Sequence, residues 1–149
     1  MPTSGKHLGT IRVPTAQCGD LLLAIPVNQA GRAVAIRTSS RIPGTPAWLA
    51  GIARADAHSI WLLDVHGTPA NHAGRAAPFS LALLAAGPQP HWGLAIDRVE
   101  ALGVASPSSQ RWPGSWPAGW AARCLLADGR SALLIEPAAI TRDLAALAA

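Results

Sequence analysis

Residues 121–135 read AARCLLADGRSALLI, two short apolar runs on either side of Asp128 and Gly129. An Asp-Gly pair between such runs is the strongest short-range signal for a β-hairpin, because both residues tolerate the backbone conformations of a tight turn. We therefore predict strands over residues 121–127 and 131–135. The chain is expected to be rich in β-structure at this end.

More short apolar runs precede this hairpin, separated by Gly, Pro, Asn and His residues. They predict strands over residues 8–13, 21–27, 60–65, 79–86, 92–96 and 98–104. Residues 31–37 fit either a strand or a short helical turn, and the proline-rich stretch 106–120 is predicted to be a loop. Pro137 suits the first position of a helix, whose apolar face would carry Ile140, Leu144 and Leu147. This pattern indicates an all-β barrel or sandwich with one C-terminal helix.

Composition supports a folded chain without an obvious cofactor. The 149 residues are enough for one domain or two small lobes, and 50% of them are hydrophobic while only 13% are charged. The chain has neither a secretory signal pattern nor an apolar run of about eighteen residues, so we expect a cytoplasmic protein. Cys18 and Cys124 are too few for a disulfide framework and lack zinc-site spacing, so we interpret them as reduced, buried thiols.

The charge balance leaves nucleic-acid binding as an alternative. The formal net charge is +4, from eleven arginines and one lysine against eight acidic residues. A protein that follows a phosphate backbone gathers its cations into a stripe or onto one helix. Here they are spread along the chain without a run of three, which favours other partners over nucleic acid.

The candidates for catalysis or metal binding are few. They are His58, Asp64, His66 and His72. Asp64 and His66 would share one face only if the strand continued through Gly67, which we expect to end it. We interpret the histidines as loop residues, and a small enzyme using His58, Asp64 and His66 stays as a second alternative.

Tryptophans recur at every fourth position of the predicted loop, at Trp112, Trp116 and Trp120. The intervening prolines and glycines exclude a helical face. The indoles either cover the edge of a core or form an aromatic contact patch for a partner protein.

Four segments of the chain occur in the order typical of one family. They are TPAWLAGI (45–52), SIWLLDVH (59–66), WGLAIDRVEAL (92–102) and LLADGRSALLIEPAAI (125–140). In type and order these segments resemble the CheW family of bacterial chemosensory adaptor domains, and the residues that match the family pattern are Pro46, Gly51, Asp64, Gly93, Asp97 and Val99. The tryptophan after Pro46 and the C-terminal end are more similar to adaptors of pilus-linked (twitching motility) systems.

The resemblance implies a CheW-like domain over residues 21–149, preceded by a partly flexible segment over 1–20. It implies two small SH3-like five-stranded barrels that share a hydrophobic seam, with a short C-terminal helix. It also implies a noncatalytic adaptor without cofactors or metals. The implied partners are the cytoplasmic tips of chemoreceptors and the regulatory domain of a CheA-type histidine kinase, at membrane receptor arrays, with neither nucleic acid nor direct membrane insertion. Asp97 would end one strand and fix the bend into the next by accepting backbone N–H bonds.

Two positions depart from the family pattern. The family usually has N-L-R-G where this chain has Arg54, Ala55, Asp56 and Ala57, and Arg32 falls where members often carry a glutamate. We hypothesise that Arg32 and Asp56 form the family's ion pair with its ends exchanged; alternatively, the gapless count is offset and the two never meet. The expected interaction surface comprises Arg32, Arg54, Asp56 and Ala57, with Gly51 and Gly93 supporting turns.

Overall fold

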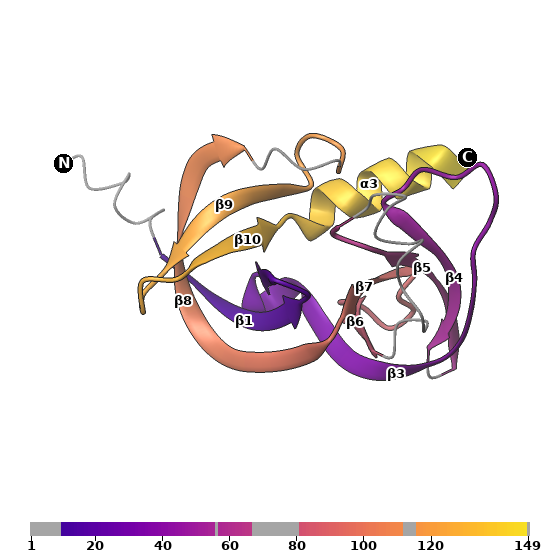
Figure 1. Cartoon of the computed structure of the whole chain (residues 1–149), viewed down its shortest axis with the longest axis horizontal. Coiled ribbons are helices and arrows are strands. Elements are labelled where there is room, and N and C mark those ends of the chain that lie inside the picture. Colours follow the sequence, from indigo (N-terminus) through magenta and orange to yellow (C-terminus); the bar gives the residue numbers. More distant parts are fainter. Residues whose placement is uncertain (1–9, 56, 67–80, 112–115, 149) are drawn as a thin grey trace. The chain divides into compact units, whose positions relative to one another are not determined.

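The computed structural model describes residues 10–55, 57–66, 81–111 and 116–148, and only the backbone of 109–111 and 148 (Figure 1). These residues contain ten strands, one 3-10 helix and one α-helix. The strands are β1 (Ile11–Cys18), β2 (Leu21–Ala24), β3 (Ala30–Ser40), β4 (Leu49–Ala55), β5 (His58–Leu63), β6 (Leu81–Ala85), β7 (Trp92–Ile96), β8 (Arg98–Arg111), β9 (Ala121–Leu126) and β10 (Ser131–Ile135). The helices are η1 (Val27–Gln29) and α3 (Pro137–Ala148).

The strands close into two five-stranded barrels, one in each of two compact units. The first unit holds β1, β2, β8, β9, β10 and α3, and the second holds β3 to β7 together with Trp116. The second unit is therefore inserted in the sequence between β2 and most of β8. Residues 11–18, placed before the domain by the sequence-based boundary, form β1 of the first barrel. The predicted all-β fold of two small barrels and a short C-terminal helix is confirmed.

The first barrel has the strand order β1-β2-β10-β9-β8. The pairs β1/β2, β9/β10 and β8/β9 are antiparallel, while β2 and β10 pair in parallel at Leu23↔Leu133 and Ala24↔Leu134. β2 ends before Pro26, because proline has no N–H to donate to a ladder. The core is a cluster of small and branched side chains: Val13, Leu22, Ala24, Ala105, Cys124, Leu126, Ala132 and Leu134.

The predicted hairpin is present in the first barrel, with a longer loop than a two-residue turn. Leu126 N donates to Arg130 O at 2.8 Å, and Gly129 N donates to Leu126 O at 2.9 Å. Gly129 has a φ of 95°, so the loop is a turn followed by a left-handed glycine. The Asp128 carboxylate accepts the Arg130 N–H at 3.0 Å, and this bond lowers the pKa of Asp128 below its usual range.

The loop predicted over 106–120 was wrong in its first part, because β8 continues to Arg111. Pro107 stays in register with Cys124 of β9, and the register then shifts before Arg111 pairs with Ala122. The strand therefore carries Pro107 next to an irregularity, a place where sheets tolerate a proline.

The second barrel has the order β3-β4-β5-β7-β6. β7 is buried along its whole length and lies between β5, to which it is parallel, and β6, to which it is antiparallel. The undecided stretch 31–37 lies within β3, whose register with β6 shifts between Ala30 and Ala33. The core consists of Ala53, Ala55, Ile60, Leu62, Ala82, Leu84 and Ala95.

Helix α3 begins at Pro137 as predicted, with Ile140 and Leu144 buried. The predicted apolar face is shorter than expected, because Leu147 is 61% exposed. Trp120 is wholly buried and its Nε1–H donates to Asp143 Oδ2 at 2.8 Å, while Trp120 O accepts the Glu136 N–H at 2.8 Å. Trp120 thus links the segment before β9 to the residue before α3 through its backbone carbonyl, and to the middle of α3 through its indole.

Candidate functional site

The six residues expected to form an interaction surface all belong to the second unit. Arg32 is exposed on β3 and lines an open groove of about 380 Å³ together with His58 of β5. The floor of the groove includes Gly31, where an added Cβ would lie 2.6 Å from the Leu84 carbonyl oxygen. The groove therefore combines a guanidinium and an imidazole with an apolar wall of Leu84, Pro88 and Pro90.

Gly51 lies within β4 and not at a turn, contrary to the sequence-based expectation. It has a φ of 149° and sits where the register between β4 and β5 shifts. A Cβ at this position would overlap the carbonyl oxygen of Ser40. The requirement for glycine is therefore local and structural, because only glycine combines this backbone conformation with such a close approach.

Gly93 also lies within a strand, β7, and it is buried. A Cβ added there would come to 3.0 Å from Ile60 Cδ1 and 3.2 Å from the Leu83 carbonyl oxygen. Gly93 thus leaves room for the Ile60 side chain and the Leu83 carbonyl group inside the second barrel, and it supports no turn.

The departure from the family motif falls at the end of β4. Arg54 is exposed and pairs across the sheet with Thr38 of β3 on one side and Ser59 of β5 on the other. Ala57 is exposed in the turn before β5. Asp56 lies outside the described residues, so the hypothesised ion pair between Arg32 and Asp56 stays a prediction.

The candidates for an enzyme site do not converge. His58 begins β5 and Asp64 follows its last residue, so an extended strand of about 20 Å separates their backbones. His72 lies outside the described residues. Within the described ranges, no three His, Cys, Asp or Glu side chains are grouped so as to hold a metal ion.

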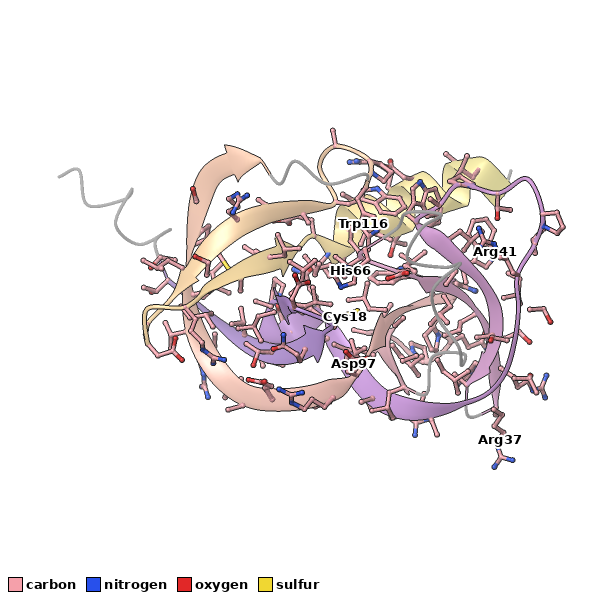
Figure 2. All side chains as sticks on the ribbon, in the orientation of Figure 1. Cys18, Arg37, Arg41, His66, Asp97 and Trp116 are labelled. Carbon is pink, nitrogen blue, oxygen red and sulfur yellow. The ribbon has the colours of Figure 1, made fainter. Side chains whose placement is uncertain are left out.

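Asp64 instead organises the end of β5. It is wholly buried, and its Oδ1 accepts the His66 N–H at 3.1 Å. Its backbone N–H donates to Trp48 O at 2.9 Å, and its carbonyl accepts the Trp116 Nε1–H at 2.8 Å. The labelled His66 and Trp116 side chains flank this strand end in Figure 2. Asp64 therefore organises the bend that directly follows β5.

The two described tryptophans of the series, Trp116 and Trp120, are buried, in agreement with the first of the two interpretations. Trp116 is 6% exposed and Trp120 is fully buried, each in its own unit, so neither presents its ring to a partner. Trp112 lies outside the described residues.

Asp97 stands at the bend between β7 and β8, where the chain leaves the second unit. The predicted position at a strand end is correct, and the residue is exposed (Figure 2). Among the residues that the structure describes, Asp64 is the acidic residue that is buried.

Both cysteines are free and buried, as expected. Cys18 ends β1 and Cys124 lies in β9, so both thiols belong to the first barrel. Burial raises the pKa of the Cys124 thiol, which makes it a packing residue and a poor nucleophile.

Fold and site together define a class of protein: paired small β-barrels whose candidate site is an exposed, cation-bearing surface of strands. The CheW-like domain family matches residues 12–145, and the chain belongs to this family. Among solved structures, the chain is similar to the crystal structure of the scaffolding protein TtCheW from Thermoanaerobacter tengcongensis. The two share 14% identity with a TM-score of 0.54, over 85% of this chain and 88% of that chain. This likeness shows the fold, and no curated protein matches the sequence.

Among the described residues, no helix is long and apolar enough to cross a bilayer.

Proposed function

We propose that this protein is a noncatalytic adaptor that couples chemoreceptors to a CheA-type histidine kinase in a bacterial chemosensory pathway. The observation that carries the proposal is the match of residues 12–145 to the CheW-like domain family. The two closed five-stranded barrels support it, because such barrels offer outer strands and loops for binding other proteins. The pathway would act at the cytoplasmic face of receptor arrays, and we propose a pilus-linked system.

The proposed interaction surface lies on the second barrel. Arg32, Arg54 and Ala57 are exposed there, and Arg32 lines a groove with His58. Gly51 and Gly93 would act indirectly, because the first permits the irregular pairing of β4 and the second permits the packing of β7. We propose that Arg32 and Asp56 form an ion pair whose polarity is opposite to the usual one of the family.

Reconstitution with purified partners tests the function. The immobilised protein is presented with the regulatory domain of the CheA-type kinase and with a receptor tip fragment, both from the source cell. We expect both to be retained, and kinase activity to become receptor-dependent when all three are mixed. If neither partner is retained by the folded wild-type protein, the adaptor function is wrong.

Charge exchange tests the ion pair in the same assay. Arg32→Glu and Asp56→Arg should each weaken retention, and the double variant should recover part of it, since the pair is restored with reversed ends. Additive losses in the double variant would exclude the pair while leaving the adaptor function intact.

A further inference from the structure

The arginines of the second barrel are concentrated on two adjacent strands. Residues 30–55 contain four arginines and no acidic residue. Arg32 lies at the groove, and the other three, Arg37, Arg41 and Arg54, are exposed at the end of β3 and on β4. We call these three residues the arginine cluster.

The strand register places two members of the cluster, Arg37 and Arg54, side by side. Thr38 pairs with Arg54, and Ile36 pairs with Ala55, so Arg37 is the extra residue of a β-bulge directly beside Arg54. A bulge redirects a side chain out of the regular alternation. Figure 2 shows Arg37 extending away from β3. Arg41 follows Ser40, the last residue of β3, which pairs with Ile52, so its backbone lies roughly 10 Å along β4 from that of Arg54. Figure 2 shows the Arg41 side chain apart from that of Arg37.

The structure provides these three cations with no acidic partner in the residues it describes. Two arginines of the first unit do have acidic partners: Arg130 bonds Glu100 at 3.1 Å and Asp128 at 3.0 Å, and Arg142 bonds Asp143 at 3.2 Å. Arg12 and Arg123 stand there on strands β1 and β9, which are not neighbours in the barrel. Like charges directly opposite each other on adjacent strands destabilise a sheet, so neighbouring arginines without an acidic partner among the described residues carry a cost that a binding surface explains.

The surroundings of the cluster are those of a protein interface. The hydroxyl residues Thr38, Ser39 and Ser40 are exposed beside it, and Ile42 is 40% exposed next to Arg41. Arginine around an apolar contact is typical of surfaces that bind proteins. A surface that binds nucleic acid requires a longer row of Lys and Arg side chains than the three arginines of this cluster.

We infer that the arginine cluster docks an acidic surface of a partner protein, in which Asp and Glu side chains surround an apolar contact. The inference rests on the proposed function, because it names the chemistry of the surface that a kinase or receptor presents to the second barrel. The partner's carboxylates would accept hydrogen bonds from the guanidinium groups, and Ile42 would pack against the apolar centre of the partner's surface.

A matched pair of double variants tests the inference. Arg37→Gln/Arg54→Gln removes two charges from the cluster, while Arg12→Gln/Arg123→Gln removes two exposed charges from the first barrel. Binding of the kinase regulatory domain and of the receptor tip fragment is measured for each at low and high salt, and circular dichroism verifies the fold. We expect the cluster variant to lose about tenfold in affinity for one partner near 50 mM salt and much less near 300 mM, because screening already weakens the wild-type contact. The control variant should stay within about twofold.

Two polyanions provide a readout that does not need the natural partners. A poly-glutamate peptide and a DNA duplex of equal charge are titrated into the same proteins. We expect poly-glutamate binding that the cluster variant loses and the control variant keeps. Equal losses of poly-glutamate binding in the two variants, or no loss in either, would overturn the inference, even if the kinase and the receptor bind. Preference for the duplex over poly-glutamate would overturn it in favour of nucleic acid, and absence of kinase and receptor binding alone would overturn the adaptor function.

Discussion

Gly51 illustrates how one residue sets a local structure. The family resemblance identified it as a conspicuous position, and the structure gives the reason: a φ of 149° and a backbone neighbour at Ser40 that leaves no space for a side chain. The residue that shapes the arginine cluster was not visible in this way. Arg37 is conspicuous only because it is the extra residue of a bulge. The position of a bulge depends on how two strands pair, which single-residue propensities do not encode.

Substitution Gly51→Ala should therefore destabilise the second barrel by about 2–3 kcal/mol, from backbone strain and from displacement of the Ser40 segment. Urea denaturation monitored by circular dichroism measures the loss. Gly44→Ala is the control, because Gly44 has a φ of 81° with open space around it. The control should cost only about 1 kcal/mol, and equal losses in the two variants would contradict the steric argument.

Among the elements, strands with simple alternation or a clear turn were predicted best. The prediction for β7 is correct at both ends, and β10 and the start of α3 also match. β3, whose register shifts against both β4 and β6, stayed undecided because the small alternating side chains of residues 31–37 also fit a short helical turn. β8 was predicted too short because Pro107 was interpreted as a strand breaker. In both cases, partner strands accept an irregularity that the local sequence alone disfavours.

Helix α3 carries a pH-dependent contact. The Trp120 Nε1–H, and then the neighbouring Arg142, hold the pKa of Asp143 below its usual range. Because the folded-state pKa is lower than the unfolded one, the contact stabilises the fold above about pH 4 and is lost as pH falls through the folded pKa.

Asp143→Asn should therefore flatten the decline of stability below about pH 4, since the amide does not titrate. Urea midpoints measured across this pH range provide the test. In a Trp120→Phe background, which lacks the indole donor, the same substitution should have a smaller effect on the slope. An unchanged slope in both backgrounds would exclude this contact as a source of the pH dependence.

At the scale of the whole molecule, periodicity alone indicated a barrel or a sandwich, and only the resemblance specified two barrels. The order of the strands was beyond reach, because the parallel pairs β2/β10 and β5/β7 join segments through long connections. The candidate site was predictable in part. The family resemblance marked Arg32 and Arg54, but placing Arg37 beside Arg54 required the register of β3 against β4.

The insertion of the second unit predicts coupled unfolding of the two barrels. If residues 30–98 unfolded alone, the first barrel would have to close a loop of about 70 residues, at a cost of roughly 4 kcal/mol. Labelling of Cys18 and Cys124 reports on the first barrel, and fluorescence dominated by Trp48, Trp61, Trp92 and Trp116 reports on the second unit. The two urea midpoints should coincide. A fluorescence change that clearly precedes thiol labelling would show that the second barrel unfolds independently.

The nested strand order also has a consequence for biosynthesis. As the nascent chain leaves the ribosome, β1 and β2 emerge first, yet their partners β8 and β10 follow only after the whole second barrel has been translated. The early hairpin must therefore wait with both edges uncovered, at the time when unpaired edges are most prone to aggregate. Slow translation of residues 99–135 would lengthen this wait, so codon choice in that segment becomes a determinant of soluble yield.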